Sequence, residues 1–356
     1  MSPATLFDHA LRLHRQHPGG PLPDGGKPYP DDEIRRPRSR NDPRLAGADV
    51  AAILDRHFGS VAHPSDLVFR DCDVPIHRNE HIAAAALRAD RQRVRRTGRW
   101  LVRHATDRRA ALVGLALLAT DHADDDIPLI QTIGLLADWF GPLAAEALQR
   151  RRDGAEALTW LAERTTGWGR VYVIEALCRL GSAGTRSWML RHACDGDFLN
   201  GYFAGQVATT AHLHEAITGD DVDDALIDHT GRLLKAITDC GGMGTTLEHY
   251  PPSAIVLAAH ATHLSRQAPT FPRYVNAATI ADELITKPPA RSGCTSEQRD
   301  TIVGQYLTVL ERPEWNATAR TGLTPPTDLT TWFLTGPAAR LPLNLKSDEP
   351  PAAPPG

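Results

Sequence analysis

The stretch AALVGLALLA, residues 110–119, decides the fold class of this chain. It is apolar on nearly every side of a helix, so it must be covered by neighbouring helices. Residues 222–237 show the complementary pattern, because Leu226 and Leu233 lie on one face and charged residues lie between them. Fully buried helices beside amphipathic ones predict an all-α protein.

The same pattern continues outward through residues 79–311. Apolar segments are separated by short turns, and no run shows the sustained alternation of a strand. Asp107 and Thr295 are expected helix starts, and Gly181 is an expected helix end. The pattern predicts a layered array of antiparallel helical pairs. We expect its helices near 79–89, 92–105, 108–120, 126–135, 141–150, 154–163, 169–180, 184–193, 197–206, 221–239, 252–265, 276–286 and 296–311.

Composition and periodicity divide the chain into five segments. Pro, Gly and charged residues crowd the second segment, and the last ends in KSDEPPAAPPG, a composition typical of disorder. The predicted segments are an N-terminal helix (1–17), an irregular loop (18–46), a short helix with a connector (47–78), a helical domain (79–340) and a disordered tail (341–356).

Cysteine usage and hydropathy indicate where the chain works. Its five cysteines form no CxxC pair and no framework spacing, so we interpret them as free thiols in a reducing compartment. No apolar run is long enough for a membrane span, and the first residues lack the apolar core of a signal peptide. The sequence therefore predicts a cytoplasmic protein without a membrane partner.

Charge is divided unevenly along the chain. The first 110 residues hold 20 Lys and Arg against 14 Asp and Glu, whereas the rest holds 19 against 29. Within the basic part, one helix face carries a stripe that we define as Arg91, Arg95, Arg99 and Arg103. Such a stripe can contact phosphates. Pairing with the acidic remainder of the chain, an arginine-rich composition and a solvated helix face are the rival explanations.

Histidine spacing offers one weak candidate for a metal site. His77, Glu80 and His81 fit the pattern H-x-x-E-H, in which two histidines on one helix face hold zinc and the glutamate activates water. The motif lies at a loop–helix junction, and its third ligand is not evident. His260 and His263 share a helix face, yet no acidic partner lies nearby in the sequence. We therefore predict no metal site.

Residues 166–206 read TGWGRVYVIEALCRLGSAGTRSWMLRHACDGDFLNGYFAGQ. This segment resembles a bacterial family of HEAT-like helical-repeat proteins, some of whose members are labelled limonene hydroxylase. The matching positions are Gly167–Arg170, Glu175, Trp188–Arg191, Asn200 and Tyr202, and Tyr172 replaces a histidine of the family pattern. The similarity spans roughly residues 90–315. It implies a HEAT-like α-solenoid.

The matching residues with the most chemical character are the candidates for binding. They are Trp168, Arg170, Glu175, Trp188 and Tyr202. Glu175 lies in an otherwise apolar helix, so we expect a buried ion pair, with Arg170 or with an arginine of an adjacent helix. The alternative is that Glu175 binds a ligand on the concave surface of the solenoid, where the aromatic residues either line that surface or pack in the core.

No nucleotide-binding loop, nucleophile elbow or cofactor motif is present, and no acid–base set converges. We therefore expect a non-catalytic helical-repeat protein that binds a protein partner and needs no cofactor. The first alternative is nucleic-acid binding, or the base-excision chemistry of HEAT-like DNA glycosylases, through the arginine stripe. The second is an enzyme that acts on a small apolar substrate, as the limonene hydroxylase label implies.

Overall fold

A computed structural model of the chain describes residues 4–32, 46–343 and 345. Helices and their connections make up these ranges, and none of the residues within them forms a strand. The predicted all-α class is therefore confirmed. Most of the tail predicted at 341–356 lies outside the described residues, as does the middle of the loop predicted at 18–46.

The chain divides into two compact units. Unit 1 is Met1–Thr185, and unit 2 is Arg186–Gly356. Their boundary lies inside the range 79–340 that the sequence predicts as one helical domain. Unit 1 also contains the segments predicted as the N-terminal helix, the loop and the connector.

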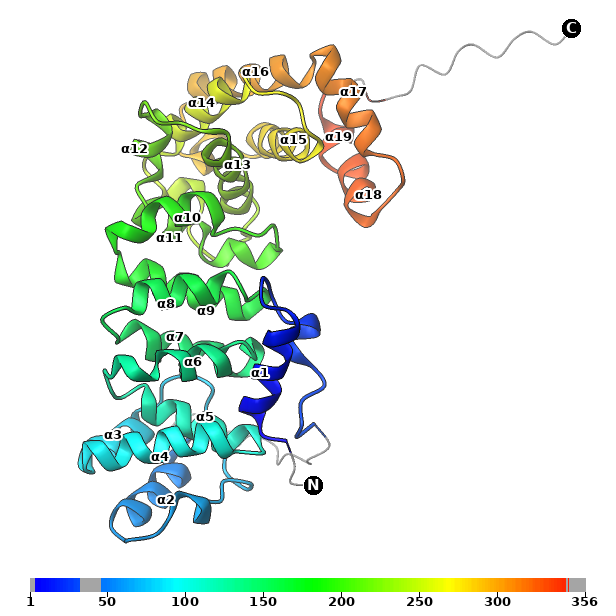
Figure 1. The fold of residues 1–356 in the computed structure, drawn as a ribbon. Coiled ribbons are helices and arrows are strands. Elements are labelled where there is room, and N and C mark those ends of the chain that lie inside the picture. The colour runs from blue at the N-terminus through cyan, green and yellow to red at the C-terminus, as the bar shows by residue number, and fades with distance from the viewer. Residues whose placement is uncertain (1–3, 33–45, 344, 346–356) are drawn as a thin grey trace, which may run out of the picture. The chain divides into compact units, whose positions relative to one another are not determined.

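The helices of unit 1 pack in consecutive pairs. They are α1 (Leu6–Gln16), α2 (Ala48–Phe58), α3 (Glu80–Arg88), α4 (Arg91–His104), α5 (Arg108–Leu118), α6 (Ile127–Gly134), α7 (Ala137–Gln149), α8 (Gly154–Ala162) and α9 (Gly167–Leu180). Helix α2 contacts α3, α4 contacts α5, α6 contacts α7 and α8 contacts α9 (Figure 1). The second members of these pairs also contact one another, α5 with α7 and α7 with α9.

The apolar stretch at 110–119 forms most of α5, where it is buried as its composition predicts. Asp107 begins the helix by accepting the backbone N–H groups of Arg109 and Ala110. Gly98 of α4 and Gly114 of α5 meet at the crossing of the two helices. A Cβ on Gly114 would lie 2.7 Å from the Leu101 Cβ, so the glycine permits this close approach.

The described part of the N-terminal loop, residues 18–32, packs against helices of its own unit, unit 1. Tyr29 and Asp31 are buried. The buried Arg108 guanidinium lies 2.7 Å from Asp31 and 2.6 Å from Asp32, and it stacks on the rings of Tyr29 and Trp139. The Gly and Pro content of the loop gave no sign of this anchoring, because the carboxylates and their arginine are far apart in sequence.

Unit 2 is built around α13 and α15. Its helices are α10 (Arg186–His192), α11 (Ala204–Thr210), α12 (Leu213–Thr218), α13 (Asp224–Thr238), α14 (Ser253–Leu264), α15 (Phe271–Thr286), α16 (Ser296–Leu310), α17 (Pro313–Gly322), α18 (Asp328–Thr335) and α19 (Pro337–Arg340), and a 3-10 helix η6 spans Phe198–Tyr202. Helix α13 contacts α10, α11 and α15, and α15 also contacts α16, α17 and α19. Asp282 of α15 holds Arg340 at the end of α19.

Two predicted helices of unit 2 differ from the structure. Helix α15 begins at Phe271 rather than near residue 276, because Thr270 caps it and Pro272 occupies its first turn. The single helix expected at 197–206 is instead η6 followed by α11. All five cysteines are free and buried. Among the described residues, no helix combines the length and apolar character that crossing a bilayer requires.

Candidate binding surfaces

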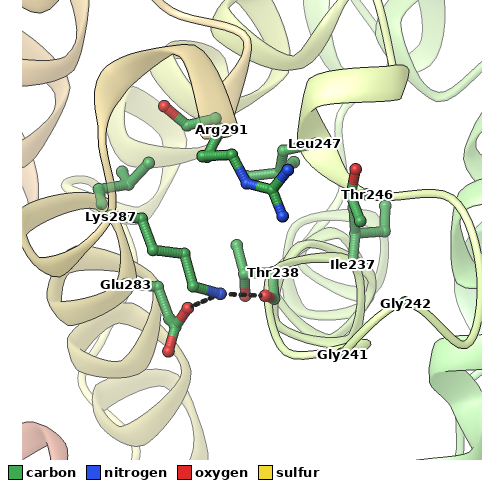
Figure 2. A pocket seen from close by; sticks show the side chains of 11 residues that line it. Ile237, Thr238, Gly241, Gly242, Thr246, Leu247, Glu283, Lys287 and Arg291 are labelled. Atoms are coloured by element: carbon green, nitrogen blue, oxygen red, sulfur yellow. Dashed lines mark hydrogen bonds and ion pairs between the residues drawn. The ribbon is translucent and has the colours of Figure 1, made fainter.

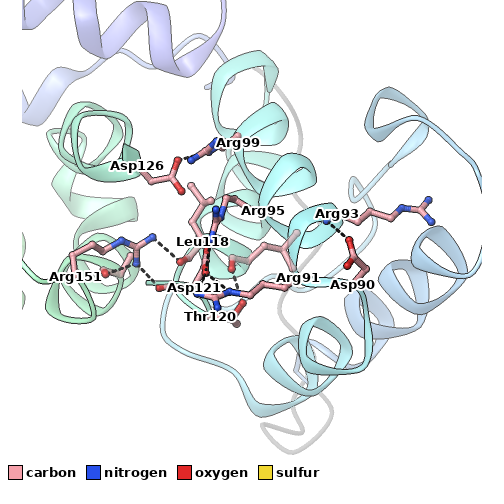
Figure 3. Close-up of polar contacts among 12 residues, drawn as sticks. Asp90, Arg91, Arg93, Arg95, Arg99, Leu118, Thr120, Asp121, Asp126 and Arg151 are labelled. Carbon is pink, nitrogen blue, oxygen red and sulfur yellow. Dashed lines mark hydrogen bonds and ion pairs between the residues drawn. The ribbon is translucent and has the colours of Figure 1, made fainter. Parts of the chain in front are cut away.

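The arginine stripe of α4 is largely engaged within unit 1. Arg91 lies 2.7 Å from the Asp121 carboxylate, and Arg95 pairs with the same group. Arg99 Nε donates to Asp126 Oδ1 at 2.5 Å, as Figure 3 shows. Both carboxylates are buried between α5 and α6. Pairing with the acidic part of the chain thus accounts for three of the four stripe residues.

Arg151 completes this network from α7's side. Its buried guanidinium donates to the carbonyl oxygens of Leu118 and Asp121, both at 2.9 Å, which satisfies the C-terminal end of α5 (Figure 3). Burial opposes ionisation of Asp121. Hydrogen bonds from Arg95, from the backbone and from Arg91 outweigh burial, so the pKa of Asp121 lies far below its ordinary value. The network therefore holds the Asp121 carboxylate in its charged form.

Arg103, the last stripe residue, is exposed and lies outside this network. It forms no ion pair among the residues that the structure describes. Arg96 and Trp100 lie on the same side of α4 as Arg103, because Trp100 follows Arg96 by four residues and precedes Arg103 by three. Arg103 is thus the stripe residue that remains accessible to an external anion.

The structure separates the histidines of the H-x-x-E-H pattern. Helix α3 begins at Glu80, and Asn79 caps it by accepting the backbone N–H of His81. His77 therefore precedes the helix and does not share a face with His81. Its ring packs edge-on against Tyr172 at 5.3 Å, and burial lowers its pKa. Among the described residues, no three His, Cys, Asp or Glu side chains are placed to hold a metal.

The segment GWGR begins α9 and joins it to its neighbours. Gly169 lies against Ala137 of α7, where a side chain would collide. Arg170 is buried and donates to the Ala162 carbonyl oxygen at 2.5 Å, which caps α8. Trp168 stacks with Tyr172 and keeps a partly exposed ring. Most of this motif therefore packs α9 against α7 and α8.

Glu175 does not form the buried ion pair that we expected. Its carboxylate is half-buried, and the ion pair that it makes is with Arg179 on the same helix, at 3.9 Å. Burial raises the pKa of Glu175, and Arg179 only partly opposes this effect. Apolar neighbours in sequence suggested full burial, but the position lies at the edge of the buried face of α9.

The remaining candidates, Trp188 and Tyr202, belong to unit 2. Trp188 lies on α10 with its ring against His192, and Tyr202 ends η6. Both side chains are half-buried. The five predicted binding residues are thus divided between the units, with Trp168, Arg170 and Glu175 in unit 1.

Unit 2 contains a groove that the sequence did not single out. It encloses about 1260 Å³ of space, part of it open to solvent. Its lining residues come mainly from α13 and α15, and others come from η6 and α18. The residues that carry its chemistry are Phe198, Arg232, Lys235, Phe271, Asn276 and Leu329. We call this feature the α13–α15 groove.

Two polar side chains of the groove are unpaired within the described part of the chain. Arg232 is exposed and forms no ion pair there, and the half-buried Asn276 side chain forms no hydrogen bond there. Lys235 lies over the Trp332 ring, with its Nζ 5.4 Å from the ring centre. The neighbouring Arg273, by contrast, is held by Asp228 at 2.6 Å.

Apolar side chains stand exposed around the same groove. Phe198 of η6 is 76% exposed, and Leu329 of α18 is 51% exposed. Trp332 of α18 is also substantially exposed. Large apolar groups gathered beside a hollow are typical of surfaces that another molecule covers.

A smaller hollow adjoins the groove and shares Arg232 and Asn276 with it. Its wall includes His260, which is buried and shares a hydrogen bond with Tyr306, 2.8 Å from Nδ1 to the hydroxyl oxygen. Burial lowers the pKa of His260 to about 4. His260 is therefore a neutral structural residue at ordinary pH. His263 is bonded elsewhere, to the Ile217 carbonyl oxygen.

A second pocket of unit 2 lies at the C-terminal ends of α13 and α15. Figure 2 shows Lys287 bound to Glu283 and donating to the Thr238 carbonyl oxygen at 2.9 Å. Arg291 donates to Glu248 at 2.7 Å. Both cations of this pocket are therefore paired within the unit, unlike Arg232 of the groove.

Comparison of the chain with family models, with curated proteins and with solved structures found no match.

Proposed function

We propose that this chain is a non-catalytic, HEAT-like helical-repeat protein that binds a protein partner. The pairwise packing of α2 to α9, with α5, α7 and α9 in mutual contact, supports an α-solenoid of antiparallel pairs. The resemblance of residues 166–206 to a HEAT-like bacterial family points the same way. The five free, buried thiols support a cytoplasmic location.

The observation that carries this proposal is the α13–α15 groove. It combines a cation and an amide that have no partner within the described residues with exposed aromatic and aliphatic side chains in one hollow. Aromatic residues and arginine are enriched at the centres of protein interfaces, because they bury much area and still form hydrogen bonds. The groove therefore offers a partner both apolar contact and polar specificity.

Site-specific photo-crosslinking tests this proposal. A benzophenone amino acid replaces Phe198 in the full chain, which is expressed in its native cells and irradiated. We expect a discrete adduct with another protein. The control carries the same group at Ile255 of α14, which is exposed but does not line the groove. Equal labelling at both positions, or none at Phe198, contradicts the proposal.

Nucleic-acid binding is the second candidate function, and the exposed Arg103 is the observation that favours it. A single accessible cation gives weak affinity for nucleic acid, because the affinity grows with the number of phosphates that are neutralised and so release their counterions. The test is retention on heparin at low salt, compared between the wild type and Arg103→Glu. Retention that Arg103→Glu abolishes favours nucleic acid.

A further inference from the structure

We infer that the occupant of the α13–α15 groove is an extended peptide segment whose backbone binds Asn276 and whose acidic side chain pairs with Arg232. This inference rests on the proposed function, because it names the form in which a protein partner enters the groove. It is carried by the two polar side chains, Arg232 and Asn276, that have no partner among residues 4–32, 46–343 and 345, and by the apolar groups beside them.

Asn276 is suited to a peptide backbone. Its amide presents one acceptor and two donors in a plane, as a peptide unit presents a C=O and an N–H. The side chain is half-buried on α15 and lines both the groove and the adjoining hollow. The amide atoms of Asn276 stay in contact with solvent, and an extended backbone can replace that water because it supplies both a donor and an acceptor.

Arg232 is suited to a carboxylate. The fold supplies two aspartates, Asp224 and Asp228, for Arg273, whereas no described residue forms an ion pair with Arg232 on the same face of α13. The guanidinium is therefore free to hold a carboxylate through two parallel hydrogen bonds. One acidic side chain of the bound segment satisfies it.

The exposed side chains of Phe198 and Leu329, which we call the apolar rim, set the spacing between the apolar and the acidic residue of the peptide. Side chains of an extended chain alternate in direction, so residues two apart point the same way. An apolar residue between Phe198 and Leu329 and an acidic residue at Arg232 can then enter the groove from one face of the peptide. The rim thus predicts an apolar residue at an even spacing from the acidic one.

The charge balance of the groove argues against a nucleic acid as its occupant. Arg232 and Lys235 are offset by Asp197 and Asp239, which also line it. Asp197 accepts the backbone N–H of Leu199 and is fixed in place. A polyanion needs a clear excess of cations, whereas a peptide with a single acid does not.

Display of random linear peptides against the full chain tests the inference. We expect enriched sequences that share an acidic and an apolar residue at an even spacing. An enriched synthetic peptide is then measured by fluorescence anisotropy. Arg232→Glu should weaken its binding by about tenfold or more, and replacing the peptide's acidic residue with lysine should restore affinity for this variant.

Asn276→Leu separates binding from folding. It should weaken every enriched peptide by about tenfold. Its melting temperature should stay close to that of the wild type, because the half-buried amide makes no hydrogen bond to other described residues. The matched control is Arg299→Glu on α16, whose arginine pairs with Asp300 and does not line the groove; it should leave peptide affinity unchanged.

Three results overturn the inference. One is an absence of enriched peptides. Another is equal affinity of the wild type and Arg232→Glu for an enriched peptide. The third is binding of a labelled single-stranded oligonucleotide that Arg232→Glu abolishes. If crosslinking at Phe198 still captures a protein, the partner binds as a folded surface and the proposed function stands. If crosslinking also fails, both fall.

Discussion

The Arg108 guanidinium lies 2.7 Å from the Asp31 carboxylate, and both side chains are only 4% exposed. The pair connects the start of α5 to a segment more than seventy residues earlier. Asp31 also accepts the backbone N–H of Arg108 at 2.8 Å. This buried contact holds the N-terminal segment against the helices of unit 1.

Removing the cation of this pair should destabilise unit 1. Arg108→Met leaves the Asp31 carboxylate buried without its charge partner, so we expect a loss of about 3 kcal/mol in the free energy of unfolding. Urea unfolding of the full chain measures it. The double variant Arg108→Met with Asp31→Asn should recover much of the loss. An unchanged urea midpoint in the single variant would show that the pair does not stabilise the fold.

The arginine stripe should act through stability. The double variant Arg91→Gln with Arg95→Gln leaves the buried Asp121 unpaired, and we expect a loss of about 2 kcal/mol, most of it from the more buried Arg95. Retention on heparin at low salt should change little. A variant of wild-type stability that no longer binds heparin would instead assign these arginines to an external polyanion.

Stability should also depend on pH through His260. Its pKa is about 4 in the folded chain and about 6.5 when unfolded, so the unfolded chain binds the extra proton first. The contribution of His260 is complete above pH 6.5 and is lost as the pH falls towards 4, with a limiting slope of about 1.4 kcal/mol per pH unit.

Urea unfolding at several pH values measures this slope. His260→Gln should unfold with a shallower dependence between pH 6.5 and 4. His57 and His77 also have lowered pKa values, so a slope of the same sign should remain in the variant. Parallel curves for the wild type and the variant would contradict the assignment of His260 as a buried neutral group.

A pair of glycine substitutions tests the close crossing of α4 and α5. Gly114→Ala places a methyl group 2.7 Å from the Leu101 Cβ, so we expect a net loss of about 2 kcal/mol despite the better helix propensity of alanine. Gly304→Ala is the matched control in α16, where the added Cβ meets no atom within 4 Å beyond its own stretch of helix backbone. It should gain about 1 kcal/mol. Thermal unfolding of both variants measures these changes in stability. A stabilised Gly114→Ala variant would contradict the close packing of α4 on α5.

Exposed Phe198 should matter for binding and not for folding. Phe198→Ser should change the free energy of unfolding by less than about 0.5 kcal/mol, because the ring is mostly in water. Affinity for an enriched peptide should fall by about tenfold. Leu87→Ser on α3 is the control in unit 1, since it is equally exposed and lies far from the groove in sequence. A similar loss of peptide affinity in Leu87→Ser would show that Phe198 has no special role in binding.

Local signals in the sequence located most of the helices. Helix α5 lies close to the range 108–120 expected for it, and Thr295 caps α16 with Gln298 in a reciprocal pair of hydrogen bonds. These features depend on neighbours within one or two turns. Helices α17 to α19 lie within the predicted helical domain, but the sequence did not predict them as separate helices, because their segments are short and weakly periodic.

Contacts between distant segments could not be read in the same way. The sequence left open whether the stripe pairs with the acidic part of the chain, and the structure identifies Asp121 and Asp126 as its partners. The groove was missed because Arg232 and Asn276 look like ordinary surface residues of their helices. Their significance depends on the absence of a nearby partner among the described residues, which only the packing of α13 on α15 reveals.

The buried cysteines turn the chain into its own unfolding reporter. Cys72 and Cys178 belong to unit 1, whereas Cys194, Cys240 and Cys294 belong to unit 2. A buried thiol is alkylated only when its surroundings open, so a pulse of iodoacetamide at each urea concentration marks whichever unit has opened. Mass spectrometry of the labelled peptides would then give the order in which the two units lose their structure.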